Sequence, residues 1–417
     1  MDNRPDSGIC SPMTDLLLTG GGLNGTALAL AASRIGLSVT LIDAAPDPGS
    51  RVPDFDGRAY AIALASQRLM SAIGLWPALA AEAQPMTEIK VTDGRPGQGP
   101  APWMMHFEAS ELGEEPMGFM VEDRHLRHHA RAALDESDLV ETRYGQTVTA
   151  QRVTPTGVEV DTSTGETLTA RLLIGADGRS SGTARRAGIR RMEWGYGQTA
   201  LVCAVEHEKP HDGIAHQFFM PGGPLAILPL TGNRASIVWS EDDAVAAPLA
   251  TADDAAFLKA LAPRFGEFLG SIRLIGGRHA YPLGLSLTHQ MIADRVALVG
   301  DAAHGVHPIA GQGLNAGLKD IAALIEVLAE ARRRGEDIGT RPVLTRYQQW
   351  RRFDVASLAL ATDTFNRLFS NDNPILRAAR DFGMGAIDAL PRLRRSFVQE
   401  AAGLTGDLPN LLKGKLP

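Results

Sequence analysis

The sequence has little cysteine, no long apolar run and no excess of positive charge. Its 417 residues include only Cys10 and Cys203, which suit neither a disulfide framework nor a metal site, so we expect a reducing compartment and no metal. No uninterrupted apolar run of about 18 residues is present, and the polar segment 1–14 lacks the pattern of a signal peptide. The net charge of -7 argues against nucleic-acid binding. We therefore expect a cytoplasmic protein without a transmembrane helix.

A glycine-rich turn in the second half of the chain is typical of a cofactor site. The apolar run 295–299 predicts a buried strand that ends on Gly300, and apolar spacing predicts a helix from about Gly313. Asp301 could accept hydrogen bonds from a ligand's hydroxyls, and Gly311 and Gly313 would let backbone approach a flat ligand. The N–H groups at the helix start would suit an electron-rich ring edge. The alternative is that these glycines serve packing alone.

A second glycine-rich turn lies near the start of the chain. A strand predicted over 15–19 leads into Gly20, Gly22 and Gly25, which fit the pattern G-x-G-x-x-G, and a helix follows. The next strand ends on Asp43, at the distance of about 20 residues expected of a carboxylate that binds ribose hydroxyls. This combination predicts a dinucleotide with an unphosphorylated ribose, and the alternative is a βαβ unit whose glycines only allow close packing.

Three further residues are candidates for a cofactor contact. Arg58 lies in a small, apolar neighbourhood, where it could contact a phosphate or a ring edge, or form a surface ion pair. Arg124 stands at a predicted helix start and allows the same two interpretations. Asp177 closes a buried strand with an Asp-Gly turn, which again places a carboxylate at a strand end.

The segment 194–281 predicts a second, mainly antiparallel domain, because short strands alternate there with Gly, Pro and Asn turns. Apolar side chains on one face of this sheet could line a substrate pocket or form its core; they are Phe218, Met220, Leu228 and Trp239. The segment 93–102 predicts a long hairpin tip, 140–173 a small antiparallel meander, and the chain from 342 onward is mostly helical.

Three separated motifs occur in order: 20–25, 175–178 and 300–304. Together they resemble the FAD-dependent aromatic hydroxylases typified by para-hydroxybenzoate hydroxylase, and further segments resemble the ubiquinone-biosynthesis hydroxylases. Those segments are 56–59, 223–230, 238–240, 307–315 and 403–409. The resemblance spans nearly the whole chain. In one departure, Ala184 stands where the family usually has an arginine, and Arg185 follows one place later.

The resemblance implies that FAD binds with Asp43 on the adenosine ribose, Asp301 on the ribityl chain, Pro308 beside the flavin, and the backbone of 311–315 at its pyrimidine edge. The predicted cofactor-binding residues are Gly20, Gly22, Gly25, Asp43, Arg58, Arg124, Asp177, Gly300, Asp301, Pro308, Gly311, Gly313, Leu314 and Asn315. No catalytic side chain is assigned, and His304 and His307 are interpreted as structural.

The fold implied is α/β, α+β overall, with a Rossmann-like FAD-binding domain interleaved with an antiparallel substrate domain and a C-terminal helical region. The expected segments are 1–84, 118–182 and 283–340 for FAD; 85–117 and 183–282 for substrate; and 341–417 for the helical region.

The family chemistry implies that NAD(P)H reduces FAD, oxygen adds, and a flavin hydroperoxide hydroxylates an electron-rich ring. The resemblance therefore favours a monooxygenase that hydroxylates a polyprenylated phenol on the route to ubiquinone. Alternatives are a hydroxylase of a soluble aromatic, a flavin oxidoreductase acting on an isoprenoid, and a non-catalytic scaffold of a biosynthetic complex.

The C-terminal segment from Arg341 is net positive, although the whole chain is negative. Arg392, Arg394 and Arg395 lie beside apolar residues in one short helical stretch, which is typical of docking to an anionic membrane. The segment could attach the protein to the inner face of the membrane or to a membrane-bound partner, or it could be a solvated basic face of a packed helix.

Overall fold

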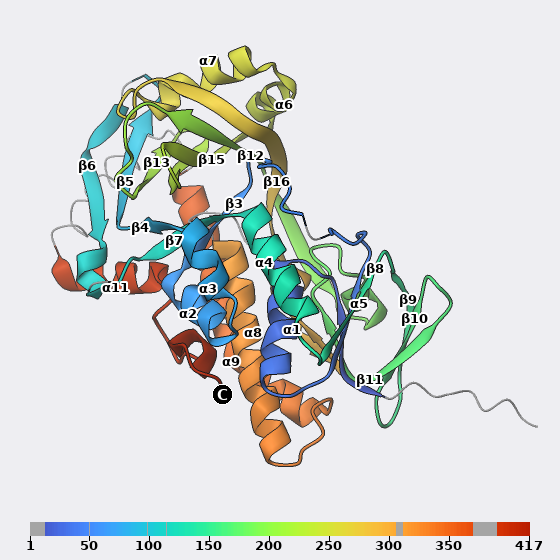
Figure 1. Cartoon of the computed structure of the whole chain (residues 1–417). Coiled ribbons are helices and arrows are strands. Elements are labelled where there is room, and N and C mark those ends of the chain that lie inside the picture. The colour runs from blue at the N-terminus through green and yellow to red at the C-terminus, as the bar shows by residue number, and fades with distance from the viewer. Residues whose placement is uncertain (1–12, 50, 98, 114, 306–311, 370–389) are drawn as a thin grey trace, which may run out of the picture.

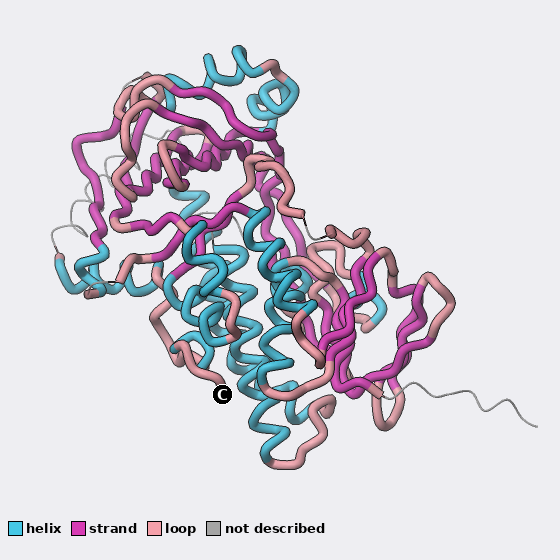
Figure 2. Tube along the Cα trace, viewed as in Figure 1, coloured by secondary structure: helices cyan, strands magenta, loops and turns pink. Residues whose placement is uncertain are grey.

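The computed structural model describes residues 13–49, 51–97, 99–113, 115–305, 312–369 and 390–417. Within those residues the strands form a mainly parallel sheet, a mainly antiparallel sheet and a small sheet between them (Figure 1). Helices gather around the parallel sheet and over the far side of the antiparallel one (Figure 2). The mixed α/β architecture expected from the sequence is confirmed, and the domain boundaries remain a proposal.

The first sheet has the order β17-β18-β11-β1-β2-β8, in which the last five strands are parallel. Its strands are apolar runs because layers cover both faces: Leu16, Leu17 and Leu18 of β1 have no exposed surface. The strands are β1 (Thr14–Thr19), β2 (Val39–Asp43), β8 (Val140–Tyr144), β9 (Val148–Val153), β10 (Val158–Thr162), β11 (Thr167–Gly175), β17 (Ile292–Ala293) and β18 (Val296–Leu298).

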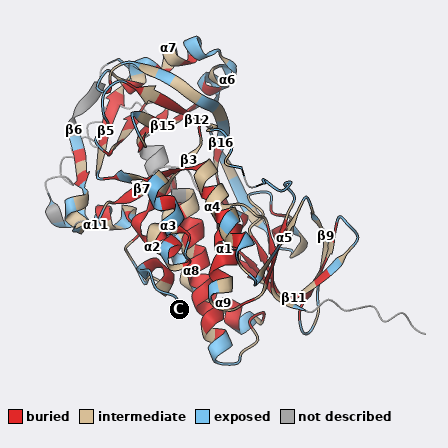
Figure 3. Cartoon of the chain, viewed as in Figure 1, coloured by how far each residue is buried: buried red, intermediate tan, exposed pale blue. Residues whose placement is uncertain are grey.

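Helices cover one face of this sheet, and the hairpin β9–β10 covers the other. On the helical side α1 and α8 pack together and are almost wholly buried (Figure 3). On the opposite side Leu17 and Leu173 meet Val158 and Val160 of the hairpin. The helices around the sheet are α1 (Leu23–Arg34), α2 (Leu64–Ala72), α3 (Trp76–Leu79), η1 (Ala80–Glu82), α4 (Asp123–Asp135), α5 (Gly182–Arg186), α8 (Gln312–Arg333) and α9 (Arg341–Phe369).

The second sheet has the order β19-β16-β12-β15-β14-β13-β5-β6, and its pairs are antiparallel except β13 with β5. Its outer face is covered by α6 (Asp243–Thr251) and α7 (Asp254–Phe265). The strands are β5 (Glu88–Arg95), β6 (Gly99–Glu108), β12 (Arg191–His207), β13 (Ile214–Met220), β14 (Gly223–Leu230), β15 (Arg234–Asp242), β16 (Ile272–Thr288) and β19 (His304–Gly305).

The small sheet, of order β3-β7-β4, connects the two larger sheets: Met86 and Met120 pack against Ala204 and Ala215 of the second sheet. None of the helices in the described ranges is long and apolar enough to cross a membrane. The remaining elements are β3 (Ala59–Ala63), β4 (Gln84–Met86), β7 (Gly118–Glu122), η2 (Ala109–Leu112), η3 (Gly300–Ala302), α11 (Pro391–Ala401) and η5 (Asn410–Lys413).

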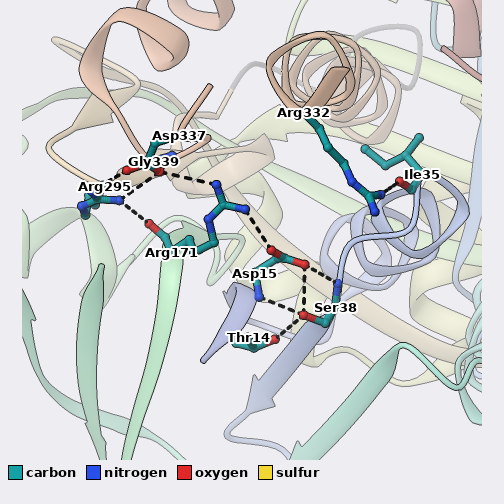
Figure 4. Close-up of polar contacts among 9 residues, drawn as sticks. All are labelled: Thr14, Asp15, Ile35, Ser38, Arg171, Arg295, Arg332, Asp337 and Gly339. Carbon is teal, nitrogen blue, oxygen red and sulfur yellow. Dashed lines mark hydrogen bonds and ion pairs between the residues drawn. The ribbon is translucent and has the colours of Figure 1, made fainter. Parts of the chain in front are cut away.

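Charged side chains tie together the amino ends of the parallel strands (Figure 4). Asp15 at the start of β1 accepts hydrogen bonds from the Ser38 backbone N–H at 3.0 Å and from Arg171 Nη1 at 3.2 Å. Arg295, just before β18, binds Asp337 at 2.7 Å and the Pro155 carbonyl oxygen at 2.7 Å. These contacts link three strands to the connection between α8 and α9.

Two of the local predictions need correction. The expected hairpin tip at 93–102 is shorter, because β5 continues to Arg95 and β6 already begins at Gly99. The expected meander is only partly antiparallel, since β8 pairs with β2 in parallel. The mainly antiparallel segment predicted over 194–281 also contains two helices, α6 and α7, which cover the sheet.

Candidate cofactor and active site

Of the three glycines in the first turn, Gly20 and Gly25 allow close packing of the backbone, and Gly22 leaves space beside it. Gly20 has φ +96, and a Cβ there would lie 2.4 Å from the Ala176 carbonyl oxygen. A Cβ at Gly25 would lie 1.8 Å from the Gly20 carbonyl oxygen, so β1, α1 and β11 meet through bare backbone. A Cβ at Gly22 would meet no described atom within 4 Å. The start of α1 thus offers N–H groups to open space, where a pyrophosphate would approach.

Asp43 ends β2 beside this turn. Its Oδ2 accepts a hydrogen bond from the Gly21 N–H, and its Oδ1 accepts one from the Ala45 N–H at 2.6 Å. The backbone therefore fixes the carboxylate at the carboxyl edge of the sheet. Each oxygen keeps a lone pair for a further donor, which is the arrangement that ribose hydroxyls require.

Asp301 lies on η3, the short turn that follows β18. Gly300 has φ +58 there, a left-handed conformation that favours glycine. The Asp301 side chain is exposed and has no hydrogen-bond or ion-pair partner among the described residues. Its main-chain oxygen accepts a hydrogen bond from Arg191 Nη2 at 3.1 Å. The backbone of the turn is therefore held, while the carboxylate remains open to a ligand.

The first turn of α8 is fixed to β3 by Asn315. This buried side chain accepts a hydrogen bond from the Ala63 N–H at 2.9 Å and donates one to the Ala61 carbonyl oxygen at 2.8 Å. Leu314 packs against the main core, and a Cβ at Gly313 would meet no described atom within 4 Å. The helix start is thus held against β3, and among the described residues it has space beside Gly313. Pro308 and Gly311, like His307, lie outside the described residues.

Arg58 and Arg124 are both engaged with carboxylates. Arg58 Nη2 lies 2.6 Å from Asp56 and 3.3 Å from Asp123, and the hydrogen bond with Asp56 is the main reason that the pKa of Arg58 rises above its ordinary value. Arg124 Nε lies 2.7 Å from Glu122 Oε2. The structure thus contains the ion pairs of the alternative interpretation, and contact of either arginine with FAD stays a prediction.

Asp177 holds the segment that follows β11. It accepts hydrogen bonds from Ser181 Oγ at 2.5 Å, from the Thr183 N–H at 3.0 Å and from Thr183 Oγ1 at 2.9 Å. These contacts shape the entry into α5, where Ala184 is buried and Arg185 is exposed. The Asp177 carboxylate therefore has a structural role, and its contact with FAD is still only predicted.

The four predicted pocket residues do not share one face of the second sheet. Phe218, Met220 and Trp239 pack in the core beneath α6 and α7, with exposed fractions of 8%, 7% and 1%. Leu228 points to the opposite face and packs toward the small sheet. The prediction of a pocket lined by all four is therefore wrong: in three of them, core packing is the correct interpretation.

The inner face of that sheet has the open apolar positions. Val202 and Val238 stand opposite each other in the β12–β15 pair, and both are only partly buried, as is Leu228. At the edge of this face Tyr281 is 43% exposed and stacks on His279, with ring centroids 6.2 Å apart. An aromatic ligand could lie here with apolar contacts on one side and the cofactor site on the other.

Asp320 and Arg351 lie beneath the turn that carries Asp301, and neither is among the cofactor-binding residues predicted from the sequence. Asp320 Oδ1 accepts a hydrogen bond from Arg351 Nε at 2.8 Å, and its Oδ2 lies 2.7 Å from His304 Nε2. His304 is thereby buried in a structural contact. The sequence signal for Asp320 is its spacing of four residues from both Ala316 and Leu324. This spacing places a charged residue on the buried face of the helix. No cluster of metal-ligating side chains occurs within the described ranges.

The residues at the carboxyl edge fit an FAD molecule. The glycine turn leaves room at a helix start, Asp43 and Asp301 present oxygens for hydroxyl groups, and the start of α8 presents backbone to a ring. The FAD binding domain family matches residues 13–359 of the chain.

Two characterised relatives are similar over nearly their whole length. The ubiquinone hydroxylase UbiL of Rhodospirillum rubrum is 42% identical over 98% of this chain and 95% of its own. The 3-demethoxyubiquinol 3-hydroxylase of Escherichia coli is 35% identical over 94% of this chain and 99% of its own.

Two solved structures share the fold. The p-nitrophenol 4-monooxygenase PnpA of Pseudomonas putida has a TM-score of 0.78 at 19% identity, covering 94% of this chain and 98% of its own. A variant of Klebsiella pneumoniae HpxO, complexed with FAD, has a TM-score of 0.72 at 20% identity, covering 94% of this chain and 99% of its own. At such identities the likeness shows the architecture alone.

Proposed function

The chain belongs to the family of FAD-binding hydroxylases of ubiquinone biosynthesis, and from this premise we propose that it hydroxylates the aromatic ring of a polyprenylated phenol, with NAD(P)H as electron donor and oxygen as the second substrate. The observation that carries the proposal is the 42% identity to a ubiquinone hydroxylase over 98% of the chain. The open glycine turn supports catalysis rather than a flavin-free scaffold, as does Asp301, whose side chain is unpaired within the described residues.

Bound FAD supplies the redox chemistry that activates oxygen. The protein's own residues bind and orient: Asp43 holds the adenosine ribose, Asp301 holds the ribityl chain, and the backbone at the start of α8 faces the flavin ring. The inner face of the second sheet holds the substrate ring against the cofactor and excludes water. No side-chain acid or base is required at a fixed place, and none is assigned.

The electron donor and the substrate class are tested with purified holoprotein. We expect about one FAD per chain, and oxygen-dependent hydroxylation of a prenylated phenol with NADH or NADPH, detected by mass spectrometry with labelled oxygen. A simple hydroxybenzoate serves as the soluble competitor. Hydroxylation of the soluble compound alone would reject the prenylated substrate, and oxidation of the prenyl chain would support the isoprenoid alternative.

A pair of valines tests where the substrate lies. Val238→Phe fills the inner face and should raise KM or uncouple NAD(P)H oxidation from hydroxylation, with FAD content unchanged. Val245→Phe adds the same ring on α6, where the side chain is 40% exposed on the outer layer, and should leave turnover unaltered. Equal turnover in both variants would remove the substrate from the inner face.

We propose further that α11 brings the protein to the inner face of the membrane. Arg394 is not available, since its Nε lies 2.9 Å from Glu111 Oε1, and Val398 is buried beneath the helix. Arg392 and Arg395 are exposed, beside the apolar side chains of Leu390, 55% exposed, and Phe397, 37% exposed. Exposed cationic and apolar groups within one short helix and the residue before it suit an anionic bilayer.

Vesicle flotation tests this docking. Wild-type protein should float with anionic vesicles at low salt, and the double variant Arg392→Glu and Arg395→Glu should not. Arg394→Gln, which changes a paired arginine, is the matched control. Wild-type protein that stays in the soluble fraction would favour a protein carrier for the substrate.

A further inference from the structure

A buried carboxylate lies directly behind the turn that carries Asp301. Asp320 of α8 has no exposed surface, and three donors reach it. The Gly300 N–H donates at 2.9 Å, His304 Nε2 at 2.7 Å and Arg351 Nε at 2.8 Å. Asp320 therefore contacts both ends of the turn and the neighbouring helix α9.

The contacts of Asp320 keep it ionised. Burial alone would raise the pKa of Asp320, but the charges of His304 and Arg351 and their hydrogen bonds hold it below its ordinary value. Arg351 is itself buried, and its Nη1 lies 2.6 Å from Asp354 Oδ2, which reaches the surface. A buried charge with this many partners has one well-defined position, since every displacement leaves a donor without its acceptor.

Asp320 also lies on α8, whose start is the segment proposed above to face the flavin ring. The start of α8 is pinned to β3 by the buried side chain of Asn315. The Asp301 turn and the start of α8 therefore share one rigid support. Asp301 has no side-chain partner of its own in the described part of the chain, so the backbone of its turn decides where its carboxylate lies.

We propose that Asp320 is a positioning residue for FAD: it fixes the turn Gly300–Ala302 relative to the start of α8, so that the ribityl contact at Asp301 and the ring contact at the helix are spaced for one cofactor molecule. The proposal rests on the FAD-binding part of the proposed function and is independent of the substrate.

The test measures FAD affinity of the full-length apoprotein, with urea unfolding of the same samples. Asp320→Asn keeps the size of the side chain but removes its charge, and should weaken FAD binding at least about tenfold. Leu324→Ala, one turn further along the same buried face, is the matched control for loss of packing. It should lower the stability of the apoprotein while changing FAD affinity less than about threefold.

A double-mutant cycle separates positioning from general destabilisation. If Asp320 acts through Asp301, then Asp320→Asn should weaken FAD binding less than about twofold in an Asp301→Ala background. Should Asp320→Asn fail to fold, Arg351→Lys enters the same cycle, because it keeps the charge and alters the contact with Asp320. Independent, additive losses would overturn the proposal, as would unchanged FAD affinity in Asp320→Asn. Wild-type protein that binds no FAD would instead overturn the flavin-binding premise.

Discussion

The two ends of the parallel sheet are built in opposite ways. At the amino ends, Asp15, Arg171, Arg295 and Asp337 are joined to one another and to backbone groups. At the carboxyl ends, glycines replace bulky side chains, and Asp301 has no side-chain partner in the described ranges. Polar groups that hold the fold are saturated within the protein, whereas polar groups that bind a ligand keep free acceptors.

This division follows from the topology. All carboxyl ends of parallel strands meet at one edge, where helices start and present N–H groups, so ligands of open α/β sheets bind there. The amino ends face away from the ligand and can be closed by ion pairs without harm to function. Changes to the ion pairs at the amino ends should therefore alter stability alone, and changes to an exposed carboxylate such as Asp301 at the carboxyl ends should alter cofactor affinity alone.

The largest effect is expected from Arg295→Ala at the amino ends. Arg295 is 7% exposed and donates to two carbonyl oxygens as well as to Asp337. Its loss should lower the free energy of unfolding of the apoprotein by about 3 kcal/mol, measured by urea denaturation. FAD affinity should remain at the wild-type value, and a parallel loss of affinity would break the comparison.

A smaller effect, on FAD affinity rather than on stability, is expected from Asp301→Ala. Removal of a carboxylate that accepts hydrogen bonds from the cofactor should weaken FAD binding by about 2 kcal/mol, roughly thirtyfold. The unfolding free energy of the apoprotein should not change, because the side chain is exposed and has no partner among the described residues. Titration of apoprotein with FAD checks the affinity, and an unchanged value would remove Asp301 from the site.

The smallest effect is expected in the pH dependence of stability. The hydrogen bond from Arg295 holds the pKa of Asp337 below its ordinary value. A carboxylate with a lowered folded-state pKa stabilises the fold above its unfolded pKa of about 3.9, and this contribution disappears as the pH falls through the folded value.

Asp337→Asn should therefore be less stable than wild type near neutral pH, by no more than about 1 kcal/mol because the group is partly exposed. The difference should shrink as the pH falls below the unfolded pKa of about 3.9. A constant difference between Asp337→Asn and wild type at all pH values would show that the ion pair is not its source.

The carboxyl-end turns could be predicted from the sequence because their signals are local. A strand, a glycine and an acidic residue stand next to one another in the chain, and the spacing to Asp43 is set by one βαβ unit. The support of these turns could not be predicted in the same way. Asp320 lies on α8 and Arg351 lies on α9, and no sequence pattern in either helix indicates that the two side chains are in contact.

The prediction of the substrate face was wrong for another physical reason. The second sheet is covered on both sides, so its strands carry apolar residues on both faces and alternation does not tell one face from the other. Phe218 and Trp239 are large and apolar, which suits a pocket and a core equally. Only the pairing of the strands and the position of α6 and α7 decide that these rings pack beneath the two helices.

The long pair β12–β16 also has a mechanical consequence. The two strands are paired from Arg191 with Thr288, beside the cofactor turn, to His207 with Ile272 at the far end of the second sheet. The ladder is interrupted between Gly195 and Thr199 and again between Val202 and Ala204. A two-stranded ribbon is stiff along its axis and bends most easily where its hydrogen bonds are broken. The second sheet should therefore move relative to the parallel sheet most easily when the β12–β16 pair bends at these interruptions.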